Sequence, residues 1–372
     1  MPNGKVYDGY RNQLWPQREI IDGITVLRVW TYVAPNAGSV KRIGNFLTYM
    51  LSAVIGFLFF CRRPSIIIAT SPQFFCAWAG IFASWLKWRP LIIEIRDIWP
   101  ESIVTVGAMR KGFLVRFLEW LERRMYLQAT HIVAVGAGYR DNIISKVPVS
   151  NRISVVTNGV DFQTFQPREK SAEFLDRWNL GGKFTCAYVG TIGMAHGLEV
   201  VLAAAEKLKQ SHQNDFAFLL VGDGARRAEL ERRADILGIA DVVRFTGLLP
   251  KKSMPDVLAS CDCMLVHLKK SELFETVIPS KIFETMAMEK PLIMGVKGES
   301  ASIVRRGGCG IEMEPENADD LIRALQTLRD DRQLYDNFAR NGRLFVIREY
   351  SRDRLAGEFL AIIDRVSNTS RR

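Results

Sequence analysis

Short apolar runs rich in β-branched residues alternate with helical stretches along almost the whole chain, and this alternation restricts the possible folds more than any other feature. A parallel connection between two strands needs a crossover of a dozen or more residues, which a helix supplies. Helices then cover both faces of the sheet, so its strands are apolar throughout. In the first part of the chain the predicted strands are Ile24–Trp30, Ile66–Ala69, Leu91–Ile95, Ile132–Val135 and Ile153–Val156.

A second series of the same kind begins after the charged segment Arg168–Arg177. Its predicted strands are Phe184–Val189, Phe216–Val221, Val242–Thr246, Cys263–Leu268, Leu292–Met294 and Gly310–Met313. A chain of 372 residues can hold two domains with separate cores. We therefore predict two doubly wound α/β domains, residues 1–165 and 166–345, that face each other across a cleft. Residues 346–372 are predicted to form a helix that packs back toward the first domain.

The charge of the chain is concentrated in its first part. Residues 1–165 carry 19 Lys and Arg against 10 Asp and Glu, whereas the remainder carries 31 against 30. This imbalance predicts an anionic partner for the first domain, either a membrane surface or a polyanion. Nucleic acid is the least favoured partner, because the basic residues form no element that reads a groove. The six cysteines have no metal-like spacing, and we expect buried, reduced thiols and no metal.

Two apolar segments bear on membrane contact. Phe46–Cys61 is a largely apolar stretch of 16 residues between basic pairs. It is shorter than the roughly 20 residues that span a bilayer as a helix, so it predicts a buried core helix or an interfacial one. Met109–Met125 places an apolar stripe among basic residues, which suits either a core helix or a helix lying in the interface of an anionic membrane. The charge imbalance favours the membrane. The stripe is Phe113, Leu114, Phe117, Leu118 and Leu121, and the basic residues are Arg110, Lys111, Arg116, Arg123 and Arg124.

The segment Ile278–Ala287 follows a predicted buried strand and reads as the start of a helix. Ser280 is predicted to cap this helix, whose free N–H groups attract anions. Lys281 in the first turn opposes the helix dipole unless a phosphate lies beside it. Glu284, one turn later on the same side, could accept hydrogen bonds from the hydroxyls of a ribose. The alternative is an ordinary capped helix with a surface Lys–Glu pair, and these residues alone favour that alternative.

Three loops of the second domain could bind a phosphate or a base. The loop Gly190–Gly197 links a strand to a helix, and its glycines allow the backbone to approach a phosphate closely. His196 in this loop could donate to a phosphate or lie inert on the surface. Asp223 is expected to cap the next helix, and the backbone at Gly247 and Leu248 could contact a nucleobase. The candidate residues of these loops are Gly190, Thr191, Gly193, His196, Gly222, Asp223, Gly247 and Leu248.

In the first domain, charged residues follow the predicted strand Leu91–Ile95. Arg96 and Asp97 are predicted to face the cleft, and Glu101 could join them. A structural ion pair is the common alternative. Three charged groups beside Trp99 would suit a sugar or a diphosphate.

Taken together, these segments resemble glycosyltransferase family 4, the retaining enzymes with the two-domain GT-B fold, and within it the WbuB-like group that builds bacterial O-antigen and capsule. The resemblance extends over nearly the whole chain, and its specificity comes from the combined order of the segments. The segments that carry it are Glu94–Ser102, Thr157–Asp161, Gly190–Leu198, Val221–Gly224 and Pro279–Glu284.

The resemblance implies a nucleotide-sugar donor, UDP-linked, that the second domain holds without an essential metal. It also implies an acceptor sugar linked to a polyprenyl diphosphate, presented to the basic first domain. The protein would then act in the cytoplasm, peripheral to the inner face of the bacterial membrane. Glu284 matches the second glutamate of the family's pair, which holds the donor ribose. Asp97 is the candidate orienter or base for the acceptor hydroxyl.

The sequence departs from the family pattern at several positions. The first glutamate of the pair would fall on Thr276, with Glu275 one place away, and the phosphate-binding Arg and Lys would fall on Thr191 and His196. Lys281 and the glycine loop are therefore the candidates to neutralise the diphosphate leaving group. Relatives also have a strand and a glycine-rich loop before the point where Met1–Lys5 begins. We expect the first sheet to be incomplete there, through a truncated gene, a late start assignment or a boundary chosen for expression.

Two other functions fit the same pattern. A GT-B nucleotide-sugar epimerase would share the donor site but would not need a basic, apolar first domain. A non-catalytic nucleotide-sugar-binding protein would bind the donor without transferring the sugar.

Overall fold

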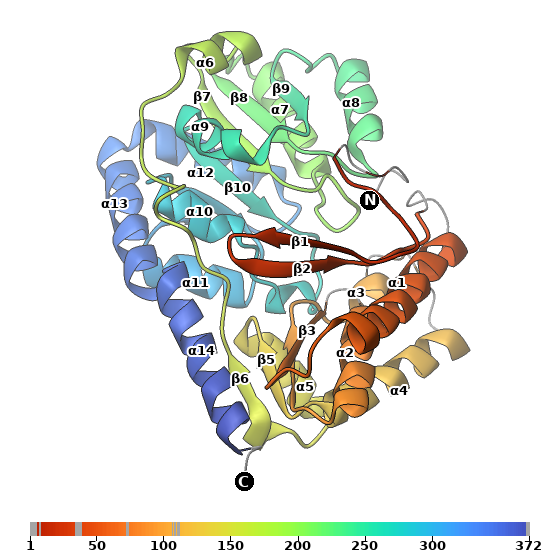
Figure 1. Ribbon diagram of the computed structural model, residues 1–372. Coiled ribbons are helices and arrows are strands. Elements are labelled where there is room, and N and C mark those ends of the chain that lie inside the picture. Colours follow the sequence, from red (N-terminus) through yellow and green to blue (C-terminus); the bar gives the residue numbers. More distant parts are fainter. Residues whose placement is uncertain are drawn as a thin grey trace. The chain divides into compact units, whose positions relative to one another are not determined.

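The computed structural model describes residues 6, 9–33, 39–71, 74–105, 107, 109 and 112–369 (Figure 1). Met1–Lys5, where we expected the first sheet to be incomplete, lie outside the described residues, as do Arg110 and Lys111 of the basic stripe. The chain divides into two compact units. Unit 1 comprises Met1–Val156 with Glu358–Arg372, and unit 2 comprises Thr157–Gly357. The sequence-based boundaries at 165 and 345 differ from these divisions by about ten residues.

Unit 1 is built on a four-stranded parallel sheet in the order β3-β4-β5-β6. The strands follow one another in sequence, so each crossover places its helices beside the next strand, as the apolar alternation predicted. The strands are β3 (Ile67–Ser71), β4 (Leu91–Ile95), β5 (His131–Ala134) and β6 (Ile153–Val155). The helices are α1 (Ser39–Phe60), α2 (Phe74–Lys87), α3 (Glu101–Thr105), α4 (Phe113–Gln128) and α5 (Ala137–Lys146), with a 3₁₀ turn η1 (Ser150–Arg152).

The first predicted strand does form, but not in the parallel sheet. β1 (Gln17–Ile21) and β2 (Ile24–Arg28) pair antiparallel as a separate two-stranded ribbon. Asp22 and Gly23 between them have φ of 49° and 80°, the positive values that a tight two-residue hairpin turn requires. The prediction that Ile24–Trp30 joins the parallel sheet was therefore wrong, because the Asp-Gly turn returns the chain onto its own preceding strand.

α1 differs from the predicted 16-residue core helix. It has 22 residues, and its window Ile43–Phe60 is, within the described residues, the one stretch long and apolar enough to cross a membrane by length and composition. Only 6% of that window is buried inside the protein. The core-helix interpretation is therefore wrong, and α1 leaves a long apolar surface exposed.

Unit 2 is built on a six-stranded parallel sheet in the order β12-β11-β10-β7-β8-β9. The chain adds strands on one side of β7, and then on the other side from β10 onward, which makes the sheet doubly wound. The strands are β7 (Phe184–Val189), β8 (Phe216–Val221), β9 (Val243–Gly247), β10 (Cys263–His267), β11 (Leu292–Gly295) and β12 (Gly310–Glu312). β8 and β10 are buried along their whole length, as a central parallel strand requires.

Helices accompany this sheet (Figure 1). α12 packs against α7, and their apolar faces join the strands in one core. α6 forms inside the segment predicted to be only a charged connection, with the Ser171 hydroxyl accepting from Phe174 N–H as its cap. The helices are α6 (Ala172–Trp178), α7 (Glu199–Gln210), α8 (Arg227–Ile236), α9 (Met254–Ser260), α10 (Lys281–Ala287), α11 (Glu299–Gly307), α12 (Ala318–Asp330) and α13 (Arg332–Glu349), with 3₁₀ turns η2 (Lys251–Ser253) and η3 (Phe274–Thr276). The last helix, α14 (Arg352–Thr369), begins in unit 2 and belongs to unit 1 from Glu358 onward.

Candidate functional site

The strand order of unit 2 reverses between β7 and β10. At such a point the connections leave the two adjacent strands in opposite directions, and the carboxyl ends of these strands border a natural binding crevice. The glycine loop 190–197 follows β7, and the segment that leads into α10 follows β10. The topology therefore brings together the two segments that the sequence analysis selected.

The glycine loop is held by its backbone to the neighbouring strand ends. Gly190 N–H donates to Val221 O and Ile192 N–H donates to Asp223 O, at 2.8 and 2.9 Å. On the other side, Lys269 N–H donates to Ala195 O at 2.8 Å. The loop is thus fixed between the ends of β8 and β10.

Glycine is required where the loops approach most closely. Gly222 has a φ of 137°, and a Cβ built on it would lie 1.9 Å from the carbonyl oxygen of Gly190. The N–H of Gly222 donates to the carbonyl of Gly247, which has a φ of 72°. These three predicted residues form a continuous backbone layer at the ends of β7, β8 and β9. The layer leaves no space for a side chain at Gly222.

Lys281 lies against this layer, at the position predicted for it. A Cβ on Gly190 would lie 3.0 Å from Lys281 Nζ, and Nζ lies 3.9 Å from the centre of the Tyr188 ring. In the part of the chain that the structure describes, Nζ donates no hydrogen bond and forms no ion pair. Burial lowers the pKa of Lys281 to about 7, although the charge of Glu284 acts in the opposite direction.

The capping role predicted for Ser280 was wrong. Ser280 has helical φ and ψ of −60° and −25°, and its side chain makes no capping hydrogen bond. An N-cap hydroxyl reaches the first-turn N–H groups from extended backbone, which Ser280 does not have. Glu284 lies half-buried on the same helix. Burial raises the pKa of its carboxyl, against the lowering effect of Lys251, Arg352 and Lys281.

His196 is partly buried and folds back into its own loop. Its Nδ1 accepts from Gly193 N–H at 3.3 Å, so Nε2 carries the proton of the neutral ring and can donate. Burial, assisted by the charge of Lys281, lowers the pKa of His196 to about 4. His196 is therefore a neutral donor rather than a cation at pH 7. Thr191 is exposed, and its carbonyl accepts from the Tyr188 hydroxyl at 2.7 Å.

The remaining predicted residues of unit 2 lie at the rim. Asp223 does not cap α8, which begins four residues later at Arg227; its Oδ1 accepts from Gly224 N–H at 2.8 Å. Leu248 is exposed after β9. The carbonyl of Gly247 already accepts from Gly222 N–H and from the Thr246 hydroxyl, so it offers little to a nucleobase.

His267 at the end of β10 is a site residue that the sequence analysis missed. Its Nδ1 donates to His196 O at 2.7 Å, and its Nε2 accepts from Glu316 N–H at 2.8 Å. These two bonds fix one neutral tautomer, and burial lowers the pKa of the ring. A histidine inside an otherwise apolar strand was the only signal in the sequence.

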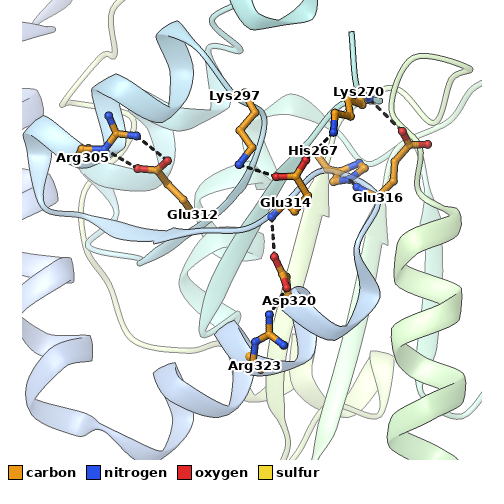
Figure 2. A network of polar contacts seen from close by, with 9 residues as sticks. All are labelled: His267, Lys270, Lys297, Arg305, Glu312, Glu314, Glu316, Asp320 and Arg323. Atoms are coloured by element: carbon orange, nitrogen blue, oxygen red, sulfur yellow. Dashed lines mark hydrogen bonds and ion pairs between the residues drawn. The ribbon is translucent and has the colours of Figure 1, made fainter.

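A network of charged residues lies near His267 (Figure 2). Glu314 pairs with Lys297 and Lys270 at 2.8 and 3.0 Å, and hydrogen bonds from these lysines, Lys297 first, hold its pKa below the usual range. Lys270 N–H donates to the Glu316 carboxylate at 3.0 Å. The network thereby joins the loop after β10 to the loop after β12.

In unit 1 the charged residues after β4 do not form the predicted single cluster. Glu101 pairs with Lys146 at 2.6 Å, the structural ion pair that was the alternative interpretation. Arg96 lies 3.6 Å from Glu94. Asp97 accepts from the Ser102 hydroxyl at 3.1 Å, and burial raises the pKa of its carboxyl in spite of that bond. Each of the three charged residues therefore has a partner of its own.

Comparisons with known proteins identify the family of the chain. The family model "Glycosyl transferase 4-like domain" matches residues 6–159, and "Glycosyl transferases group 1" matches residues 170–345. The chain belongs to the GT-B glycosyltransferases of the family 4 type. The predicted two-domain GT-B fold and the predicted family 4 type are therefore confirmed.

Individual relatives of the chain are distant, and the chain spans about 64% of the length of the first of them. The probable glycosyltransferase WbjE of Pseudomonas aeruginosa is 25% identical over 72% of this chain and 64% of its own length. The putative colanic acid biosynthesis glycosyl transferase WcaI of Escherichia coli K12 is 23% identical over 87% of this chain and 81% of its own length. The crystal structure of Anabaena HepE in complex with UDP-glucose has a TM-score of 0.68 at 16% identity, and the match covers 89% of this chain and 83% of HepE. This structural likeness shows the fold.

The close approach at Gly222 generates a stability prediction. Gly222→Ala should destabilise unit 2 by about 2–4 kcal/mol, because the new Cβ meets the Gly190 carbonyl and φ is unfavourable. The matched control Gly181→Ala, which meets nothing within 4 Å, should change stability by less than about 0.5 kcal/mol. Chemical denaturation followed by circular dichroism measures both, and equal midpoints would contradict the close packing.

The two hydrogen bonds of His267 generate a second prediction. His267→Phe keeps a ring but leaves His196 O and Glu316 N–H unpaired, which should cost about 2–4 kcal/mol. Because the folded-state pKa of His267 is lowered, the wild type should lose stability as pH falls through the unfolded pKa of about 6.5. The variant should lose less between pH 7 and pH 5. His212→Asn, an exposed control at a φ of 57° that Asn tolerates, should behave as the wild type.

Proposed function

We propose that unit 2 holds a nucleotide sugar by its diphosphate, and that the chain transfers the sugar with retention to a lipid-linked acceptor. The observation that carries the proposal is the Lys281 ammonium, which lies without an acceptor beside the backbone of Gly190 at the switch point of the sheet. Lys281 is partly buried and forms no ion pair in the described part of the chain, and a partly desolvated cation is stabilised by a nearby anion. A diphosphate at this place would supply that anion.

The glycine loop offers neutral donors to the same anion. Among the described residues, the N–H groups of Thr191, Met194 and Ala195 have no acceptor. Nε2 of His196 carries the ring proton and is the other donor of the loop. Backbone N–H groups and a charged lysine around one crevice are the combination that binds phosphates in other proteins.

Glu284 supports the nucleoside part of the proposal. Its carboxylate lies one helical turn from Lys281, and the charges of Lys251 and Arg352 act on it. A carboxylate accepts from two hydroxyls at once, which suits the paired hydroxyls of a ribose. HepE, which shares the fold, was solved with UDP and with UDP-glucose, and this supports UDP as the nucleotide.

The transfer breaks the bond between the anomeric carbon of the sugar and the β-phosphate oxygen, which keeps the electron pair. The acceptor oxygen forms the new bond on the same face, and its proton passes to the departing phosphate or to Asp97. Lys281 stabilises the charge that develops on the diphosphate, so no essential metal is required in this proposal. The raised pKa of Asp97 brings this carboxyl closer to the operating pH of a base.

The acceptor proposal rests on unit 1. Its basic charge and the exposed apolar surface of α1 suit the inner face of an anionic membrane, with the protein peripheral to it. α4 adds exposed aromatic residues, among them Phe113 with 87% of its surface exposed. WcaI is named for colanic acid biosynthesis, which supports a role in surface polysaccharide synthesis. The acceptor that we propose for this role is a sugar linked to a polyprenyl diphosphate. An amino or deoxy sugar is the proposed group.

The pKa of Lys281 generates a binding prediction. Free Lys281 loses its proton near pH 7, whereas bound diphosphate would keep it protonated, so UDP affinity should fall about fivefold between pH 7 and pH 8. Lys281→Arg, which stays charged, should abolish this dependence. Lys290→Arg is the matched control, because Lys290 is also a lysine whose pKa burial lowers. Calorimetric titration with UDP at both pH values measures the effect, and an unchanged dependence in Lys281→Arg would exclude the diphosphate seat.

Glu284 generates a prediction that separates the ribose from the diphosphate. UDP should raise the melting temperature, since a ligand of the folded form adds stability. Glu284→Gln should remove most of that shift while leaving the smaller shift by inorganic diphosphate intact. Glu289→Gln, an exposed position just beyond α10, is the control and should keep both shifts. Equal loss of both shifts in Glu284→Gln would contradict the ribose role.

A further inference from the structure

Unit 1 contains an apolar pocket that the proposed transfer does not yet use. It lies among α1, α2, α4 and the segment that contains α3, and its volume is about 300 Å³. This volume is at the lower end of the range for small-molecule sites. The lining is apolar throughout, and the residues that matter here are Phe46, Phe75, Trp99, Ile103, Leu114 and Phe117.

One wall of the pocket is aromatic. The Phe75 ring lies 6.4 Å from that of Phe46 and 6.5 Å from that of Trp99. The centres of the Phe74 and Trp99 rings lie 4.6 Å apart, and Phe74 is buried. Flat rings in mutual contact form a stiff surface that fits apolar groups with little loss of side-chain entropy.

The segment from Arg96 to Ile103 has a polar and an apolar side. Trp99 and Ile103 line the pocket, whereas Asp97 accepts from Ser102 and Glu101 pairs with Lys146. The pocket is therefore within a few residues of the carboxyl proposed to orient the acceptor hydroxyl. A molecule that binds along this segment would need an apolar chain and a polar head.

We propose that this pocket binds the isoprenoid chain of the lipid that carries the acceptor sugar, at the units next to the diphosphate. The inference rests on the proposed function, which supplies the polyprenyl class of the acceptor. Methyl-branched, unsaturated units fill an aromatic-walled pocket better than a narrow straight chain does. The pocket thus orients a chain whose head group lies beside Asp97.

Charge supports a phosphate-bearing lipid as the occupant. Arg116, Arg123 and Arg124 lie exposed on α4, the helix that supplies Leu114 and Phe117 to the pocket. Arg96, 43% exposed, follows β4 close to Trp99 in sequence. Cationic residues on the elements that line an apolar pocket match an anionic head group on an apolar chain.

Farnesyl monophosphate, titrated into the whole protein below its micelle concentration, tests the proposal. We expect binding that inorganic phosphate does not reproduce at the same concentration, and weaker binding of dodecyl phosphate. Phe117→Ala should weaken farnesyl phosphate binding about tenfold, because it removes a lining ring. Leu114→Trp, at a half-exposed lining position, should weaken it by filling the pocket. Leu127→Ala is the control on the same helix, because Leu127 is exposed and lies outside the lining, and it should change binding less than twofold.

Three results would overturn the inference. They are no binding of farnesyl phosphate, equal affinity for dodecyl phosphate, or equal loss in Leu127→Ala and Phe117→Ala, which would indicate non-specific adhesion. UDP-induced stabilisation is measured in the same samples. If it persists while farnesyl phosphate fails to bind, only the pocket is refuted. If the wild type shows no UDP stabilisation, the proposed function itself fails.

Discussion

The Lys281 ammonium is the constraint on which the interpretation of unit 2 depends. It is packed against the Tyr188 ring and the Gly190 backbone, and it forms no ion pair within the described part of the chain. A side chain in this situation is costly to keep charged, and its lowered pKa shows that cost. A protein can keep such a group charged where a bound ligand supplies the opposite charge, so an anion is the expected partner. The GT-B fold places the group where the order of strands reverses, which is where ligands of these sheets bind.

The backbone around Lys281 owes its precision to features far apart in the sequence. Gly222 lets the ends of β7 and β8 approach to a distance that no side chain would permit. His267 then fixes the far end of the glycine loop through His196, and the loop after β12 through Glu316. The charged network in Figure 2 includes Glu316, the partner of His267 in the second of these hydrogen bonds. A rigid loop presents its donors at fixed positions, which is what recognition of a diphosphate requires.

Unit 1 differs from unit 2 in its exposed apolar surface and in its charge. Its sheet is closed by ordinary apolar packing, but α1 and α4 keep apolar surface exposed, and the unit carries nearly all of the net charge. One short segment contributes both Asp97, which accepts from Ser102, and the pocket residues Trp99 and Ile103. This arrangement suits an amphiphile, as unit 2 suits a small anion. The two chemistries correspond to the two substrates of the proposed transfer.

The sequence by itself determined the two series of strands and the glycine loop, because these depend on local periodicity and on turn residues. The combination of that loop with Lys281 was expected from the family resemblance, since the residues alone favoured an ordinary capped helix. It could not give the helical conformation of Ser280, the separate β1–β2 ribbon or the partners of Glu101, since each depends on packing against distant residues. Only the tertiary structure decided the role of His267, whose hydrogen-bond partners lie 71 and 49 residues away. The pattern of a sequence records which residues prefer to be buried, whereas the contacts of a buried polar group exist only once the chain has folded.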